Sequence, residues 1–154
     1  MSTTFESLGA VVDNAIECHH LSAPLYESLQ EKTTDPRHKK LLQQMSHNET
    51  HMADLLKRMK SQVEDGVLDT RLQFTREQEP AAFIESITPV DDELDIEQIG
   101  RLGEQLHGYL VDLLEGAQQE TLSEPAGEMV RDILQLEKAE GQSFSRKANA
   151  AYEM

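Results

Sequence analysis

Residues 35–59 have the sequence DPRHKKLLQQMSHNETHMADLLKRM, and this stretch decides the fold. It opens with Asp35 and Pro36, the preferred combination of a capping residue and a proline at the first helical position. Apolar or amide side chains then recur every three or four residues, which places them on one helix face: Leu41, Met45, Asn48, Met52, Leu55 and Met59. The sequence therefore predicts a long amphipathic helix that spans about residues 36–64 and ends before Gly66.

Three further segments repeat this spacing, which predicts helices at about residues 4–31, 94–120 and 125–151. Residues 66–92 break the pattern, although the stretch between Pro80 and Pro89 is apolar enough for a short helix. Short connections favour antiparallel neighbours. The sequence therefore predicts one all-α domain, residues 1–154, folded as an antiparallel four-helix bundle with a long crossover between its second and third helices.

The composition limits the classes of function. Hydrophobic residues make up 38% of the chain and aromatic residues only 5%, so the core must consist of aliphatic side chains, which suit helix packing. A formal net charge of -15 opposes binding to nucleic acid and to anionic membranes, and no segment is apolar enough to span a bilayer. The single cysteine, Cys18, excludes an internal disulfide. We therefore expect a cytoplasmic protein that binds neither nucleic acid nor membrane.

Polar side chains lie on the predicted apolar stripes of all four helices: His19, Asn48, His107, Glu137 and Glu140. An unpaired buried polar group costs about 1–3 kcal/mol, and an unpaired charge costs more. These residues must therefore bond to one another or surround a bound group.

Two helices carry pairs of candidate metal ligands at helical spacing. Glu137 and Glu140 are three residues apart, as are Glu104 and His107, so each pair can reach one point between the helices. His51 flanks the apolar stripe of the second helix. The alternatives are that the glutamates form a solvated acidic edge and that the histidines are hydrogen-bonded core residues.

Three stretches carry a resemblance to a known family: AIECH at 15–19, followed by Tyr26; HNETHMADLL at 47–56; and LEKAE at 136–140. They resemble the ferritin-like superfamily, specifically its rubrerythrin-type branch, and the resemblance extends over nearly the whole chain in helix order. It implies a bundle that holds a dinuclear iron or manganese site. In that family the first and third helices each supply a glutamate, and the second and fourth each supply a Glu-x-x-His motif.

At several of these ligand positions, this sequence has a different residue type or leaves the matching residue ambiguous. The glutamate of the first helix falls on His19. The motif of the fourth helix falls on Glu137 and Glu140, where a second glutamate replaces the histidine. The glutamate of the third helix corresponds to Glu104 or His107.

The second helix leaves two registers open. The position of the proline favours Asn48 and His51 as the counterpart of the family motif, whereas the residues that follow favour Glu49 and Met52. The sequence also contains no cysteine-rich module of the kind found in full-length rubrerythrins. The resemblance therefore implies an external electron donor.

We predict a ferritin-like metal-binding protein with a reworked dinuclear site for iron or manganese, with zinc as a further candidate, acting in oxygen or peroxide redox chemistry or in metal handling. Its ligands would come from the following set: His19, His51, Glu104, His107, Glu137 and Glu140. The rival hypothesis is a metal-free helical bundle that serves as a self-associating structural or partner-binding protein. In either case we expect a homodimer or a higher homo-oligomer, because the Met-rich second helix and the apolar crossover offer a second hydrophobic surface.

Overall fold

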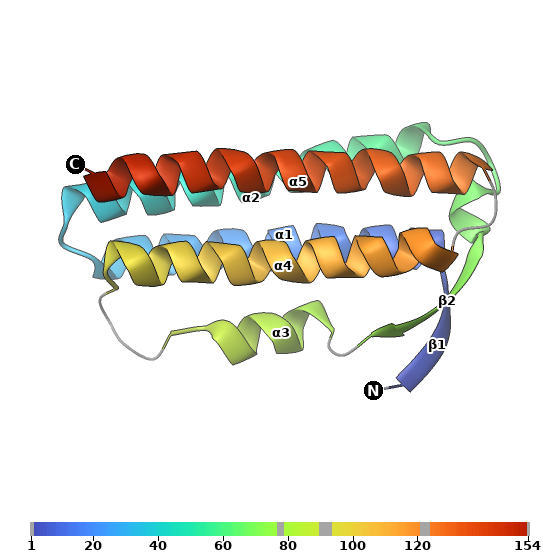
Figure 1. The fold of residues 1–154 in the computed structure, drawn as a ribbon, viewed down its shortest axis with the longest axis horizontal. Coiled ribbons are helices and arrows are strands. Elements are labelled where there is room, and N and C mark those ends of the chain that lie inside the picture. The colour runs from blue at the N-terminus through green and yellow to red at the C-terminus, as the bar shows by residue number, and fades with distance from the viewer. Residues whose placement is uncertain (1, 77–78, 90–93, 121–123, 154) are drawn as a thin grey trace.

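The structure is a computed structural model that describes residues 2–76, 79–89, 94–120 and 124–153. Four long helices dominate it (Figure 1), and they are α1 (Leu8–Lys32), α2 (Pro36–Gln62), α4 (Ile96–Glu120) and α5 (Glu124–Glu153). The shorter elements are β1 (Ser2–Ser7), the 3-10 turn η1 (Val67–Asp69), β2 (Arg71–Arg76) and α3 (Pro80–Ile87). The prediction that helices dominate the fold is confirmed.

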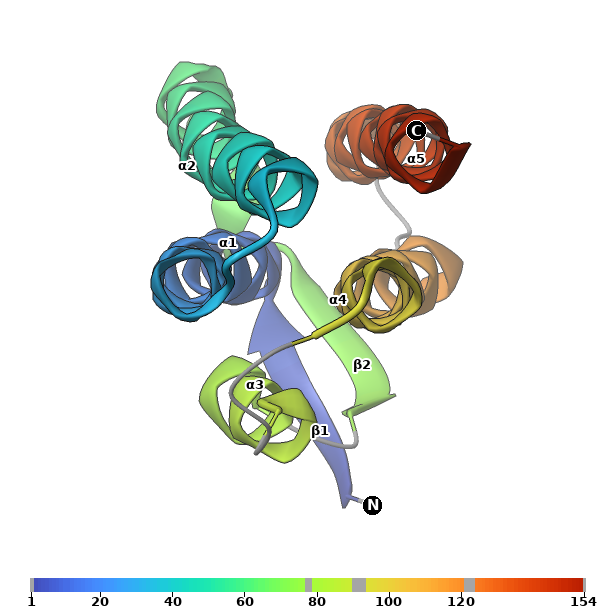
Figure 2. The same ribbon diagram turned by 90° about the vertical axis from the view of Figure 1, so that its left-hand side faces the viewer.

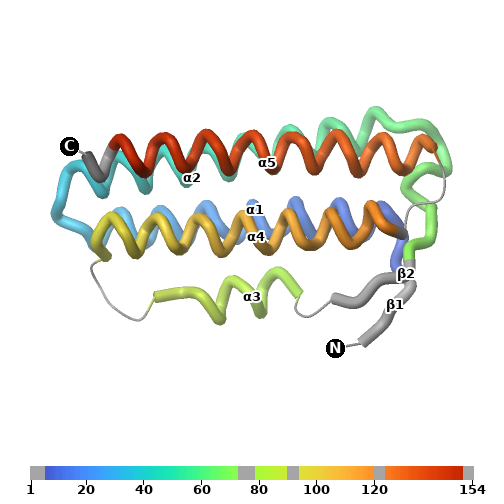
Figure 3. Tube along the Cα trace, in the orientation of Figure 1, coloured from blue at the N-terminus to red at the C-terminus, as the bar shows by residue number. Residues whose placement is uncertain are grey.

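The long helices lie side by side, as the end-on view in Figure 2 shows. Contacts between α1 and α2 and between α4 and α5 are the most extensive, and α1 also contacts α4 while α2 contacts α5. The chain path in Figure 3 reverses direction between α1 and α2 and again between α4 and α5. The segment after α2 returns along the bundle before α4 begins, so the crossover carries the chain from one end of the bundle to the other.

The N-terminal segment differs from the prediction of a helix that begins at residue 4. Residues 2–7 form β1, which pairs antiparallel with β2 so that Ser7 lies opposite Arg71. Ser7 then caps α1, because its hydroxyl accepts a hydrogen bond from the backbone N–H of Ala10 at 3.1 Å. The crossover is likewise more ordered than the broken pattern of residues 66–92 indicated, since it contains η1, β2 and α3.

The core is aliphatic, as the composition predicts. Its largest fully buried side chains are mostly leucine and isoleucine from all four long helices. The methionines of α2 contribute inward, because Met45 and Met52 are both buried within the chain. They therefore belong to the core, and Met59, nearer the end of α2, is partly buried against it. Among the residues that the structure describes, no helix is long and apolar enough to cross a bilayer.

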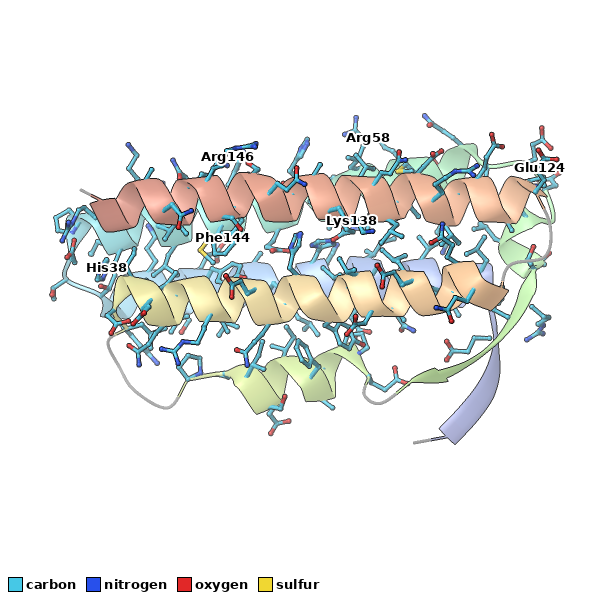
Figure 4. The ribbon with its side chains drawn as sticks, viewed as in Figure 1. His38, Arg58, Glu124, Lys138, Phe144 and Arg146 are labelled. Carbon is cyan, nitrogen blue, oxygen red and sulfur yellow. The ribbon has the colours of Figure 1, made fainter. Side chains whose placement is uncertain are left out.

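Two glycines allow α4 and α5 to interlock. Phe144 of α5 points toward α4 (Figure 4) and lies over Gly103, where an added Cβ atom would be 2.5 Å from Cε2 of the ring. In the reciprocal contact, the ring of His107 on α4 occupies the space that a Cβ atom at Gly141 on α5 would need. Each glycine thus admits a ring from the facing helix, which sets the spacing and rotation of this helix pair.

Candidate functional site

A buried histidine joins three of the four long helices. His19 of α1 is 1% exposed, and its Nε2 atom lies 2.7 Å from Oε1 of Glu137 on α5. Its Nδ1 atom bonds Oε2 of Glu49 on α2, a side chain that is 14% exposed. Both ring nitrogens are therefore used, and each faces a carboxylate from a different helix.

The two carboxylates decide the charge of the ring. Burial lowers the pKa of His19, but the hydrogen bonds to Glu137 and Glu49 outweigh it and raise this pKa to about 10. At neutral pH the ring is thus an imidazolium that donates an N–H to each carboxylate. In this state it offers no lone pair to a metal, and it supplies the positive charge that the two carboxylates require.

Glu137 is the least satisfied member of the cluster. Its side chain is 0% exposed, and while Oε1 bonds His19, Oε2 is buried and has no hydrogen-bond partner within the described residues. Leaving a buried acceptor unpaired costs about 1–3 kcal/mol, and more when it is charged. Such an unpaired oxygen in a native core calls for a water molecule, an ion, a ligand or a proton.

A third carboxylate adds to the negative charge. Glu140 lies one helical turn after Glu137 on α5 and is half-buried. Burial is the main cause of its raised pKa, the negative charges of Glu49 and Glu137 add to it, and Lys147 and His107 partly oppose it. Glu49, Glu137 and Glu140 therefore repel one another, and one imidazolium cannot neutralise all three.

Protonated, buried side chains border the cluster. Burial raises the pKa of Tyr26 well above its ordinary value, and Glu49 and Glu140 raise it further. Burial also raises the pKa of the Cys18 thiol, again with a contribution from Glu49. Both groups stay neutral, so Cys18 is not a thiolate nucleophile.

The predicted ligands divide into two groups. The structure brings His19, Glu137 and Glu140 to one region of the core. It does not bring His51 or Glu104 there, because both side chains are exposed.

The predicted pair on α4 faces a different environment. Nε2 of His107 bonds the backbone carbonyl oxygen of Glu137 instead of a carboxylate. Together with Glu104, it lines a groove of about 590 Å³ between α4 and α5. His107 therefore contacts the backbone of the helix that carries the carboxylates, while Glu104 lies at the surface.

Of the two registers left open on α2, the one with Glu49 and Met52 faces the core. Glu49 bonds His19, and Met52 is 4% exposed, whereas Asn48 is half-buried and His51 exposed. Glu49 was absent from the principal set of predicted ligands, although the resemblance had identified it as one of two registers. Residues two apart on a helix point about 200° apart, so Glu49 and His51 cannot both face His19.

The donors do not stand ready as a preformed metal site. Over the described part of the chain, no three His, Cys, Asp or Glu side chains are grouped so that they could hold a metal ion as they lie. The position of His19 explains this, since its ring stands between Glu49 and Glu137 and bonds both.

Comparisons with known proteins indicate a fold but no family. No protein-family model matches the sequence, and no curated protein matches it. Among solved structures, the chain is similar to a Thermotoga maritima protein that is provisionally named a ferritin-like diiron-carboxylate protein. The two share 14% sequence identity over 93% of this chain and 95% of the other, with a TM-score of 0.62. At this identity the likeness shows that the fold is ferritin-like.

Proposed function

We propose that this protein binds a divalent transition metal inside the bundle, with Glu49, Glu137, Glu140 and His19 as the ligands. The observation that carries the proposal is the unpaired Oε2 of Glu137, a buried carboxylate oxygen amid two further carboxylates. A cation there would satisfy that oxygen and relieve the repulsion among the three glutamates. The likeness to a protein named for a diiron-carboxylate centre supports the same reading.

The donor set fits particular metals. Carboxylates combined with an imidazole suit iron, manganese or zinc better than calcium, which takes oxygen ligands. His19 must give up a proton before one of its nitrogens becomes a ligand, because metals bind the neutral imidazole. Metal affinity should therefore rise with pH.

Iron or manganese in this centre would supply redox chemistry toward oxygen or peroxide. If the protein is not an enzyme, the same site would store or transfer the metal. The chain's own residues would hold the ion away from bulk water, since His19 and Glu137 are buried. The neutral Tyr26 and Cys18 beside the cluster add no charge that would compete with it. Reducing electrons would come from an external donor protein.

Metal binding is tested directly on the purified protein. Equilibrium dialysis against manganese(II), zinc(II) and, without oxygen, iron(II), followed by elemental analysis, should show saturable binding. Glu137→Gln should weaken binding at least tenfold, while Glu104→Gln, a glutamate exposed on α4, should leave it unchanged. Binding of no more than a few tenths of an equivalent of all three metals would refute the proposed function.

A second candidate function is favoured by the bonding of His19. Because both ring nitrogens already bond carboxylates, the bundle can persist without a metal and act in self-association or partner binding. The crossover helix α3 would supply the contact, since Phe83 and Ile87 are only partly buried there. Light scattering should then show a homodimer or a larger homo-oligomer that Ile87→Glu converts to a monomer. A monomeric wild-type protein would contradict this candidate.

A further inference from the structure

We infer that the centre takes one metal ion per chain instead of the pair found in dinuclear bundle sites. The inference rests on the proposed function, because it concerns the same residues. It follows from counting the donor side chains that each helix contributes to the cluster around His19.

A dinuclear carboxylate centre in a bundle is built from six side chains. Two helices each supply one glutamate, and the other two each supply a Glu-x-x-His motif. These ligands project inward from all four helices, and the two metal ions lie about 3.5–4 Å apart. The chain must therefore place donors on every long helix to hold such a pair.

Helices α1 and α2 lack some of these six ligand side chains. On α1 the inward group is His19, and a neutral imidazole offers one nitrogen lone pair, whereas a carboxylate has two oxygens that can reach two ions. On α2 Glu49 is present, but the residue three positions later is Met52, which is buried and 4% exposed. A buried thioether in place of an imidazole removes a ligand that iron, manganese and zinc prefer.

The third long helix along the chain, α4, contributes no carboxylate to the cluster, although His107 interacts electrostatically with Glu140. Nε2 of His107 is engaged by the backbone carbonyl of Glu137, and its ring is held against Gly141. Glu104 is exposed on the groove between α4 and α5. The side of the centre that faces α4 therefore offers no carboxylate, and the Nε2 atom of its histidine already bonds a backbone oxygen.

The remaining donors suffice for one ion. Three side chains from three helices, His19, Glu49 and Glu137, are joined by hydrogen bonds, and Glu140 lies one helical turn after Glu137 on α5 and is half-buried. Four ligands, with water in any further position, match what one transition-metal ion requires. The same set is two side chains short of the six that a dinuclear bundle centre uses, and it contains a single imidazole, so one of two ions would have no nitrogen ligand.

Stoichiometry is the measurement that tests this inference. The chain is titrated with manganese(II), and the bound ions are counted by equilibrium dialysis with elemental analysis and by native mass spectrometry. We expect saturation at one ion per chain. The electron paramagnetic resonance spectrum should be that of an isolated manganese(II) ion, without magnetic coupling to a second one.

The outcomes separate the two proposals. Two ions per chain with a coupled spectrum would overturn the one-ion inference and leave the proposed metal binding intact. No bound ion would refute the proposed function itself. A gain-of-ligand variant provides a second measurement, because His19→Glu, Met52→His and His107→Glu together supply a ligand of a dinuclear site on each of the three helices that lacks one, and should raise the stoichiometry above one. Glu104→Gln, which alters an exposed carboxylate outside the cluster, should keep it at one.

Discussion

The interlock between α4 and α5 predicts that Gly103→Ala destabilises the protein, although alanine is the better helix former. A Cβ atom at Gly103 would lie 2.5 Å from Cε2 of Phe144, whereas ordinary contacts begin at 3.4 Å, so the ring must retreat by about 1 Å. Phe144 is 8% exposed and belongs to the hydrophobic core. Its retreat therefore displaces neighbouring core side chains as well.

The magnitude follows from two opposing contributions. Overpacking a close-packed core costs about 1–3 kcal/mol, and the enclosed position of Phe144 favours the upper half of that range. Replacing glycine by alanine inside a helix returns roughly 1 kcal/mol. The net loss for Gly103→Ala is therefore about 1–2 kcal/mol. At Gly100, on the same helix, no neighbouring group lies within 4 Å of an added Cβ atom, so Gly100→Ala should stabilise by up to roughly 1 kcal/mol.

Urea unfolding followed by far-ultraviolet circular dichroism measures both variants against the wild type. We expect changes of opposite sign that separate the two variants by about 1–3 kcal/mol. Phe144→Leu introduced together with Gly103→Ala should recover part of the loss, which a double-mutant cycle would report as coupling between the two sites. Equal stability of Gly103→Ala and Gly100→Ala would refute the argument, because the ring would then need no glycine beneath it.

Three further predictions concern His19, Glu140 and the cap of α1. The pKa of His19 is raised from 6.5 to about 10, so its stabilisation is complete below pH 6.5 and is lost as pH rises through about 10, by at most about 1.4 kcal/mol per pH unit. Urea unfolding across this range should show the decline, and a His19→Gln/Glu137→Gln double variant should lack it. Because the pKa of Glu140 is raised, the folded state disfavours its ionised form, so Glu140→Gln should raise the melting temperature at neutral pH while weakening manganese(II) binding in dialysis. A variant that leaves manganese(II) binding unchanged would contradict the assignment of Glu140 to the cluster. Ser7→Ala removes the cap of α1 and should cost about 1 kcal/mol in urea unfolding, whereas Ser28→Ala, exposed within the same helix, should cost far less.

Much of the fold could be predicted because helical periodicity is a local property. The stripe of residues 35–59 and the Asp35–Pro36 start signal place α2 correctly, and its N-cap is Asp35 as expected. The strand β1 could not be predicted in the same way. Its conformation depends on pairing with β2, which lies more than sixty residues further along the chain.

The candidate site, too, could be predicted only in part. The sequence identified His19 and Glu137 as polar groups on apolar stripes, and both are buried. It could not choose between Glu49 and His51, because a difference of about 200° around α2 matters only once the rotation of that helix is known. It also could not foresee that His107 would bond the backbone of α5 through the space left by Gly141.

The amino-acid sequence alone determined that long helices would form, which face of each would be apolar, and which polar side chains would share that face. Only the tertiary structure decided which of those side chains meet. The physical reason is that helix formation depends on neighbours a few residues away, whereas the rotation and axial offset of one helix against another are set by packing. In this chain, packing turns Glu49 and Glu137 toward His19 and leaves Glu104 in solvent.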